Sequence, residues 1–246
     1  MANILVLGAT SAVATEACRL WAARGDALYL VGRSTEKLLA LKSELGAAVV
    51  AAVVAAFDDL AVNERTIGDA VAQLGRIDVA LIAHGDLGDQ LKSEMDVNEA
   101  ARIIHVNFIS VVSLLVPLAN HMERNRAGAL AAITSVAGER GRPRNFTYGA
   151  SKRAVTTYLQ GLRSRLYPCG VSVTNIKLGP TDSPMTVGHP RNVLFATAPR
   201  VARDIVRAID GRAGEVFVPW YWRPVMMLVR RIPEAVFGKI GVLGGR

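Results

Sequence analysis

Seven short apolar runs recur along this chain, and each is separated from the next by a stretch long enough for a helix. This alternation is typical of a parallel sheet whose strands are joined by helical crossovers. Because 51% of the 246 residues are hydrophobic, one domain can bury a sizeable core. The sequence therefore predicts an α/β fold in a single domain, a doubly wound (Rossmann), mostly parallel seven-stranded sheet with helices on both faces. The predicted strands lie in NILVLG (3–8), ALYLVG (27–32), AAVVAAVVAA (47–56), IDVALIAH (77–84), ALAAITS (129–135), VSVTNIKL (171–178) and EVFVP (215–219).

The third run, residues 47–56, could equally form a helix by alanine propensity. Its place in the alternation and its valines favour a strand.

Tyr148 and Lys152 in TYGASK carry the clearest chemical signal. A free tyrosine has a pKa near ~10, so lowering it toward ~7 needs about 4 kcal/mol of preferential phenolate stabilisation. On a helix, residues at i and i+4 share a face, so the Lys152 ammonium can supply much of it. Ser135, at the end of an apolar run, can hold a substrate oxygen. Taken alone, the Tyr148 and Lys152 spacing also fits a core tyrosine beside a solvated lysine.

Asn107 lies inside the apolar helical segment IIHVNFISVVSLLVP. A buried asparagine is costly unless it is hydrogen-bonded, which indicates a structural or catalytic role. The combined pattern resembles the short-chain dehydrogenase/reductase family, classical type, whose active-site tetrad is Asn, Ser, Tyr and Lys. The resemblance implies that a ketone and an alcohol are interconverted by hydride transfer, with a serine binding the carbonyl and a tyrosine delivering the proton. The residues that match the tetrad are Asn107, Ser135, Tyr148 and Lys152.

The first strand runs into GATSAVA and then into a periodic helical segment, which is the start of a mononucleotide-binding unit. The family pattern is T-G-x-x-x-G-x-G. This chain departs from it at Leu7, Ala12 and Ala14, and each alanine adds one methyl where the family has a glycine. We expect the cofactor to shift slightly without being excluded. The predicted cofactor-binding residues of this loop are Gly8, Thr10, Ser11, Ala12 and Val13.

Arg33 follows the second predicted strand, where the adenosine ribose of the cofactor is expected. An acidic residue there would accept from a 2′-hydroxyl, whereas an arginine matches a 2′-phosphate. The sequence thus favours NADP(H) over NAD(H), although Arg33 could also be an ordinary exposed loop arginine. The family's adenine-contacting Asp falls on Ala56, with Asp58 as a weaker substitute.

After the fourth strand the family has N-N-A-G, and this chain has Ile82, Ala83, His84 and Gly85. Only the glycine remains, and His84 is expected near the cofactor, where it could also be a satisfied structural histidine. The later segment LGPTDSPM resembles the family's nicotinamide loop. By that resemblance, Gly85, Gly179, Pro180 and Ser183, together with Tyr148 and Lys152, complete the predicted cofactor site.

Three arginines alternate between Ser135 and Tyr148, on the loop that borders the substrate pocket in this family. Guanidinium groups bind phosphate and carboxylate well, so an anionic substrate is expected, although a solvated loop also tolerates arginine. This loop and the segment RPVMMLVRRIP resemble the branch with decaprenylphosphoryl-2-keto-sugar reductases, which implies a lipid-phosphate-linked keto-sugar. The predicted substrate-binding residues are Arg140, Arg142 and Arg144.

The chain has a net charge of +8, and its last part, residues 220–246, interleaves basic with apolar and aromatic residues. Trp220, Tyr221 and Trp222 suit a water–lipid boundary, and residues 226–229 could enter the acyl region of a membrane. The alternative is that this tail packs on another subunit or caps the core. We therefore separate a catalytic domain, 1–219, from a tail, 220–246, and expect a homo-oligomer.

Two cysteines, Cys18 and Cys169, are too few for a disulfide framework, and the first strand begins directly at the N-terminus. A cytoplasmic location, possibly peripheral at the inner face of the membrane, is the simplest expectation. No metal-ligand spacing and no nucleic-acid reading module is recognisable. The alternatives to a small-molecule or lipid-linked carbonyl reductase are a catalytically silent NADP-binding sensor and a membrane-associated assembly partner on the same fold.

Overall fold

The computed structural model describes residues 1–182 and 195–239, and all structural statements concern these residues. Within them, seven strands form one sheet in the order β3-β2-β1-β4-β5-β6-β7, and every neighbouring pair is parallel. The predicted doubly wound sheet is confirmed, including the strand within the alanine-rich run. The strands are β1 Asn3–Leu7, β2 Ala27–Gly32, β3 Val49–Val54, β4 Val79–Ile82, β5 Ala129–Ser135, β6 Ser172–Leu178 and β7 Glu215–Val218.

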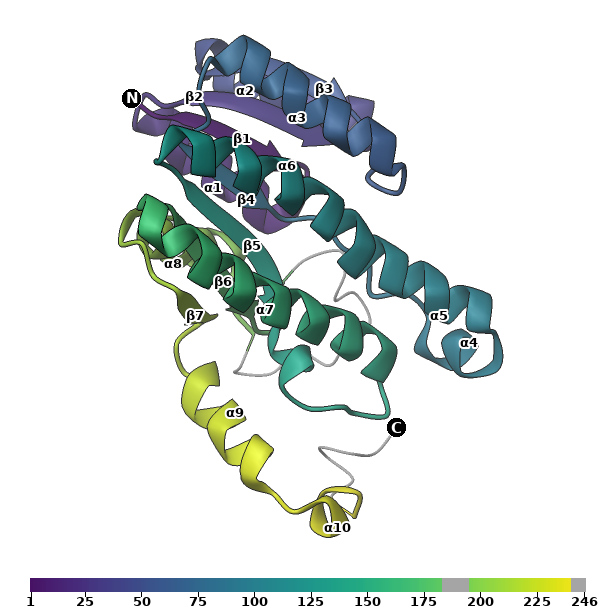
Figure 1. Ribbon diagram of the computed structural model, residues 1–246. Helices are drawn as coiled ribbons and strands as arrows, with labels where there is room; N and C mark the ends of the chain where they lie inside the picture. The colour runs from purple at the N-terminus through teal and green to yellow at the C-terminus, as the bar shows by residue number, and fades with distance from the viewer. Residues whose placement is uncertain (183–194, 240–246) are drawn as a thin grey trace.

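Helices cover both faces of the sheet (Figure 1). Successive strand residues point to opposite faces, so Leu5 and Leu7 of β1 belong to one buried cluster while Ile4 and Val6 belong to the other. Helices α3 (Leu60–Leu74), α6 (Ser110–Asn125) and α7 (Phe146–Leu166) pack on the first face. Helices α1 (Ala12–Ala23), α2 (Thr35–Leu45) and α8 (Ala198–Asp210) pack on the second.

The order of the strands fixes where a ligand can bind. β1 lies between β2 and β4. From β1 the chain builds the sheet outward through β2 and β3 on one side, and from β4 it continues through β5, β6 and β7 on the other. In doubly wound sheets, ligands bind at the carboxyl ends of the strands at such a switch point. The segments that follow β1 and β4 therefore border the expected site.

The helix that passes the site is continuous from α5 (Val97–Ile104) through a π-helical turn (His105–Ile109) into α6. Its length and hydropathy would allow it to cross a membrane, which is weak evidence because the core helix of a soluble protein passes the same test. Residues such as Leu114 and Leu115 are fully buried against the sheet. We interpret it as a core helix.

Two short helices, α9 (Trp222–Arg231) and α10 (Glu234–Phe237), follow β7 and lie below the end of α7 in Figure 1. Trp222, Met226, Val229 and Phe237 form a buried cluster with Val136, just after β5. This corrects part of the membrane interpretation, because Trp222 and Met226 face the protein interior. The remaining short elements are α4 (Gln90–Met95) and three 3₁₀ turns, Gly46–Ala48, Val136–Glu139 and Tyr167–Cys169.

Candidate active site

Ser135 and Tyr148 meet at the carboxyl end of β5. Ser135 is the last residue of that strand, Tyr148 lies in the first turn of α7, and the Ser135 hydroxyl is near enough to lower the Tyr148 pKa. The intervening turn packs tightly on α7, since a Cβ on Gly138 would lie only 2.9 Å from the backbone nitrogen of Arg153. A side chain at position 138 would push the turn away, so the glycine keeps Ser135 within reach of Tyr148.

Lys152 lies one helical turn after Tyr148 and is buried. Its Nζ atom is 5.7 Å from the centroid of the Tyr148 ring and donates a hydrogen bond to the Ile133 carbonyl at 3.2 Å. The same atom would be 3.1 Å from a Cβ on Gly85. Lys152 therefore spans the space between the tyrosine and the end of β4.

Burial governs the protonation of both groups. It raises the pKa of Tyr148 to about 12, and the neighbouring Ser135 hydroxyl offsets only part of this rise. Burial also lowers the pKa of Lys152 to about 8. The expectation that Lys152 brings the Tyr148 pKa toward neutrality is corrected for this structure, because desolvation outweighs the stabilisation of a phenolate.

Asn107 sits in the π-helical turn and is fully buried. Its Nδ2 donates to the carbonyls of Asp86 at 2.7 Å and Ile103 at 2.9 Å, and its Oδ1 accepts from the Asp86 amide at 3.0 Å. The side chain thus ties the segment after β4 to the helix. Both amide hydrogens are used, so a water could bind this side chain only at Oδ1, which has a second lone pair.

Asp86 was not singled out in the sequence. Its charge adds to the rise of the Tyr148 pKa, after burial, and Arg102 holds its carboxylate at 2.7 Å. Arg102 also pairs with Glu99 at 2.8 Å, whose carboxylate accepts from the Asp89 amide. Asp86 directly follows His84 and Gly85, and this position in the sequence could have indicated that it lies near the site.

The loop after β1 turns sharply at Gly8 and leads into the N-terminus of α1. Gly8 has a φ of +89°, and a Cβ there would lie 2.7 Å from the His84 backbone nitrogen, so only glycine fits. Ser11 caps α1 by accepting from the Ala14 amide, and the positive end of the helix dipole faces this loop. The Ala14 methyl is buried among the helix and sheet side chains. Residues Ala12 and Val13 begin the helix.

Thr10 and Arg33 lie at the neighbouring strand end. A Cβ on Gly32, the last residue of β2, would be 3.2 Å from the Thr10 hydroxyl oxygen, so the Thr10 side chain covers this end. Arg33 comes next and is exposed. Its field reaches His84, whose pKa is lowered to about 3 by burial, by Lys152 and by Arg33.

His84 is therefore neutral. Its Nε2 lies 2.8 Å from the Ser110 hydroxyl, and its ring stacks on Phe57 with centroids 4.4 Å apart. Ser110 donates to the Val106 carbonyl, so the Nε2 atom carries the proton and donates to Ser110. Its Nδ1 has no hydrogen-bond partner among the described residues.

The three loop arginines make different contacts. Arg140, predicted to bind substrate, instead donates to the carbonyls of Val229 and Ile232 and pairs with Glu234 at 2.7 Å. The prediction for Arg140 is therefore corrected, because its guanidinium serves the C-terminal helices. Arg144 is exposed and has interactions of its own.

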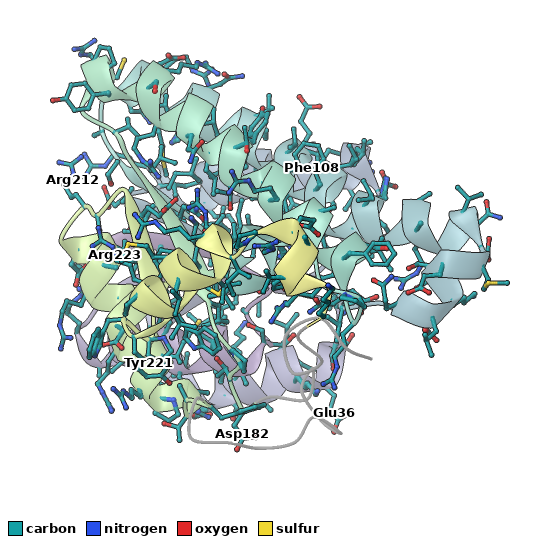
Figure 2. All side chains as sticks on the ribbon, turned by 90° about the horizontal axis from the view of Figure 1, so that it is seen from below. Glu36, Phe108, Asp182, Arg212, Tyr221 and Arg223 are labelled. Atoms are coloured by element: carbon teal, nitrogen blue, oxygen red, sulfur yellow. The ribbon has the colours of Figure 1, made fainter. Side chains whose placement is uncertain are left out.

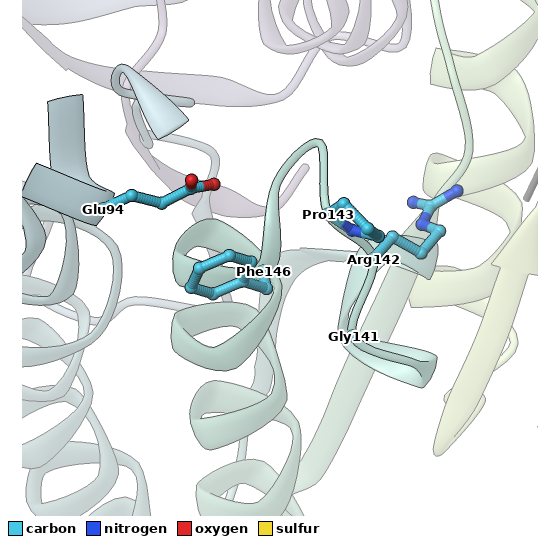
Figure 3. A pocket seen from close by; sticks show the side chains of 5 residues that line it. All are labelled: Glu94, Gly141, Arg142, Pro143 and Phe146. Atoms are coloured by element: carbon cyan, nitrogen blue, oxygen red, sulfur yellow. The ribbon is translucent and has the colours of Figure 1, made fainter. Parts of the chain in front are cut away.

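Arg142 lines a pocket of about 390 Å³ with Glu94, Gly141, Pro143 and Phe146. Figure 3 shows Glu94 reaching from α4 toward Phe146, while Pro143 and Arg142 come from the loop before α7. Burial, with the nearby charge of Arg144, lowers the pKa of Arg142 from its usual value. Among the described residues, its Nε finds no hydrogen-bond partner.

Asp58, Gly179 and Pro180 are the remaining predicted residues that the structure describes. Asp58 is exposed, and its backbone carbonyl lies 2.8 Å from Nε2 of His105. Gly179 follows β6, donates its amide to the Val218 carbonyl, and is followed by Pro180. Ser183 lies outside the described residues. In the described part of the chain, no group of three or more His, Cys, Asp or Glu side chains could hold a metal ion.

Comparison with known proteins identifies the family. Residues 2–193 match the model of the short chain dehydrogenase family. An uncharacterized oxidoreductase of Mycobacterium tuberculosis is 33% identical over 242 residues, covering 97% of each chain. The chain belongs to the short-chain dehydrogenase/reductase family of oxidoreductases.

Solved structures show the same fold. A short chain dehydrogenase from Burkholderia cenocepacia in complex with NADP has a TM-score of 0.82 and 20% identity, covering 96% of both chains. A 3-ketoacyl-(acyl-carrier-protein) reductase from Brucella melitensis complexed with NADH has a TM-score of 0.80 and 20% identity, covering 87% of this chain and 95% of that one. At this identity the likeness establishes the fold only.

Proposed function

We propose that this protein interconverts a ketone and a secondary alcohol by hydride transfer with NADP(H), and that Tyr148 is the general acid or base. The observation that carries this proposal is that Ser135 and Tyr148 meet at the end of β5, where the Ser135 hydroxyl acts on the Tyr148 pKa, with Lys152 buried one turn further along the helix. A carbonyl oxygen bound at this point would receive hydrogen bonds from both hydroxyl groups. That arrangement stabilises the negative charge that develops on the oxygen during reduction.

The pKa values give the protonation state of the site before substrate binds. With a pKa raised to about 12, the Tyr148 hydroxyl holds its proton at neutral pH. It is therefore ready to donate this proton to the oxygen of a reduced carbonyl. This is the protonation state that reduction requires, and the Lys152 ammonium contributes a positive charge close to Tyr148.

The cofactor fits the residues present. The tight turn at Gly8 and the α1 N-terminus suit a pyrophosphate, because the first N–H groups of a helix and its dipole favour anions. Lys152 reaches the Gly85 side of the crevice, where a ribose would be held. When bound, a nicotinamide supplies or accepts the hydride. The other residues proposed to line this site are Thr10, Ser11, Ala12, Val13, Asp58, Gly179, Pro180 and Ser183.

The preference for NADP(H) rests on Arg33. It is exposed directly after β2, and its charge reaches the crevice, as its effect on the His84 pKa indicates. A planar guanidinium can bind the 2′-phosphate that distinguishes NADP(H) from NAD(H). Structures with the same fold hold either NADP or NADH, so the fold alone does not favour one cofactor.

We assign an anionic ketone as the substrate class, on the basis of Arg142. This guanidinium is partly buried, stands next to the like charge of Arg144, and leaves its Nε unpaired in the described structure. Burying a charge is unfavourable unless it is paired, and a bound phosphate or carboxylate would supply the missing charge. A lipid-phosphate-linked keto-sugar is the specific candidate that the resemblance suggests.

Membrane association is supported by the outer face of α9. Trp220, Met227 and Leu228 are 70%, 53% and 68% exposed, and Arg223 and Arg231 flank them. Figure 2 shows Tyr221 and Arg223 at the beginning of this helix, on the same side of the molecule. Exposed aromatic and apolar side chains beside arginines suit the interface of an anionic bilayer. We therefore propose a cytoplasmic protein that lies peripherally on the inner membrane face.

We also propose a homo-oligomer, because Ile109 and Val116 expose apolar surface along the helix that passes the site.

The function as a whole is tested by incubating the purified protein with NADPH and separate fractions of soluble metabolites and polar lipids from cell extract. Loss of NADPH absorbance with an anionic, lipid-linked fraction supports the proposal. If the protein binds NADPH tightly but reduces nothing in any fraction, the result would favour the catalytically silent sensor.

A further inference from the structure

Arg140 caps the end of the C-terminal helix α9. Its Nη1 donates to the carbonyls of Val229, at 2.9 Å, and Ile232, while Nη2 pairs with Glu234 at 2.7 Å. The guanidinium also lies 3.9 Å from the centroid of the Phe237 ring. Carbonyl groups at a helix C-terminus lack intrahelical partners and carry partial negative charge, which a cation satisfies. Only 12% of the Arg140 side chain is exposed, so its hydrogen-bonding groups serve this contact.

Glu139, the neighbouring residue, anchors the same turn in the opposite direction. Its Oε1 lies 2.7 Å from Nζ of Lys177 on β6, with both side chains almost fully buried, at 1% and 3% exposure. This contact is an ion pair without a well-directed hydrogen bond to Oε1. Lys177 also pairs with Glu215 on β7 at 2.8 Å. Removing Glu139 would leave the buried Lys177 ammonium with Glu215 as its remaining carboxylate partner among the described residues, so the buried charge would be less well compensated.

Arg230 completes the connection, because its Nη1 lies 3.3 Å from Oε2 of Glu139. The turn Val136–Glu139 is therefore tied to α9 by Arg140 and by Arg230, and to β6 by Lys177. Trp222 packs its indole ring directly against Gly179, since a Cβ on Gly179 would lie 2.1 Å from the Nε1 atom of the ring. The C-terminal helices thus cover both the turn after Ser135 and the first residue of the loop after β6.

A single 3₁₀ turn of four residues is too short to hold its own position. On one side Gly138 packs against the backbone of α7 at Lys152 and Arg153. On the other side Val136 packs against the buried face of α9. The turn is consequently held between the helix that carries the catalytic tyrosine and the C-terminal helices. Ser135 itself also pairs with Leu178 on β6, so displacement of either support would act on it through the turn that directly follows it.

We propose that Arg140 and Glu139 are positioning residues, which use the C-terminal helices to hold Ser135 in register with Tyr148. Neither residue touches the reacting atoms in this account. The C-terminal helices are accordingly part of the active-site scaffold, whatever surface their outer face contacts. This proposal requires the reaction class proposed above but not an anionic substrate.

The test compares Arg140→Lys and Arg140→Met with wild type, using the full chain. Lysine keeps the charge but cannot serve two carbonyls, a carboxylate and an aromatic ring together. A displacement of a reacting group by about 1 Å can lower the reaction rate about 100-fold. We therefore expect kcat to fall about 10- to 100-fold in the methionine variant, and less in the lysine variant. KM should stay within about threefold for neutral and anionic ketones alike, because no substrate contact is lost.

Hydrogen exchange supplies a readout that needs no substrate. In Arg140→Met the amides of Val136–Glu139 should exchange faster, as should those of α9, because the contact joins them. The matched control is Arg165→Met, which removes a surface arginine that pairs with Glu123 and Asn120 away from the site. It should change neither kcat nor exchange in the turn. Phe237→Leu, which removes only the stacked ring, gives a second, milder test if Arg140→Met does not fold.

Two results would overturn the proposal. Unchanged kcat and unchanged exchange in Val136–Glu139 would show that the contact does not position the turn. A rise in KM confined to anionic ketones, with kcat intact, would return Arg140 to a substrate-binding role. If instead Arg142 variants leave anionic selectivity unchanged, the proposed substrate class fails and the positioning role of Arg140 stands.

Discussion

The Lys152 ammonium lies 5.7 Å from the centre of the Tyr148 ring and donates a hydrogen bond to the Ile133 carbonyl. This relationship gives the two residues different tasks. Tyr148 is buried beside Ser135 and keeps its proton, whereas Lys152 reaches toward Gly85 and Asn107 with a charge that burial makes easier to lose. The pair therefore combines a proton donor with a cation that titrates near the upper end of the physiological range.

The first prediction concerns pH. Burial lowers the pKa of Lys152 to about 8, so its charge is present below that pH and is lost above it, while Tyr148, with a pKa of about 12, stays protonated. We expect kcat/KM for reduction to be level up to the Lys152 pKa and then to fall by about tenfold per pH unit. In Lys152→Arg, whose cation does not titrate in this range, the fall should disappear. A wild-type profile that stays level well above the pKa of Lys152 would contradict the assignment.

The second prediction concerns the cofactor. Arg33→Asp should shift preference from NADPH toward NADH, because a carboxylate repels the 2′-phosphate and accepts from a 2′-hydroxyl. The measurement is the ratio of kcat/KM for the two cofactors. Lys37→Asp, with the same charge change at an exposed position in the next helix, should leave that ratio unchanged. Equal ratios in wild type and Arg33→Asp would show that Arg33 does not select between the two cofactors.

A third prediction concerns substrate charge. Arg142→Gln should raise KM for an anionic ketone by about 10- to 100-fold, as expected for loss of a charge-assisted hydrogen bond worth about 1.5–3 kcal/mol, and should leave a neutral analogue nearly unaffected. Arg153→Gln removes the same charge from an exposed position on α7 and is the control. Equal effects on both ketones would mean that Arg142 supports the loop rather than the substrate.

A fourth prediction concerns the outer face of α9. The protein should bind anionic vesicles more tightly than neutral ones, with each arginine near the surface contributing about 1 kcal/mol that salt screens. Replacing Trp220, Met227 and Leu228 with serine should remove the salt-resistant part, and replacing Arg223 and Arg231 with glutamine should remove the salt-dependent part. Vesicle flotation measures both.

These variants keep the buried face of α9 intact, so catalysis of a soluble ketone should persist. If wild type ignores anionic vesicles at low salt while the serine variant forms smaller oligomers, the face is a subunit contact.

The fold could be predicted because each strand has its own apolar run and each crossover its own helical stretch. The valines of the third run decided between strand and helix, and β3 forms there. The direction of Arg140 could not be predicted, since positions 140, 142 and 144 look alike in sequence. Its partners lie about ninety residues later, in helices whose packing depends on the whole sheet.

The protonation of Tyr148 was also beyond the sequence. Spacing places a lysine near the tyrosine but does not reveal how completely both are buried, and here burial decides both pKa values. The same applies to Trp222, which looked like a membrane anchor in sequence and packs on Gly179 in the structure.

The most direct test of the account is reduction of a ketone by NADPH in Tyr148→Phe. The ring should still pack and NADPH should still bind, as nicotinamide fluorescence can report, but kcat should fall by about 100- to 10,000-fold because the proton donor is gone. Tyr158→Phe, in the same helix against Phe108, is the matched control and should turn over like wild type. Turnover by Tyr148→Phe within tenfold of wild type would contradict the proposed mechanism.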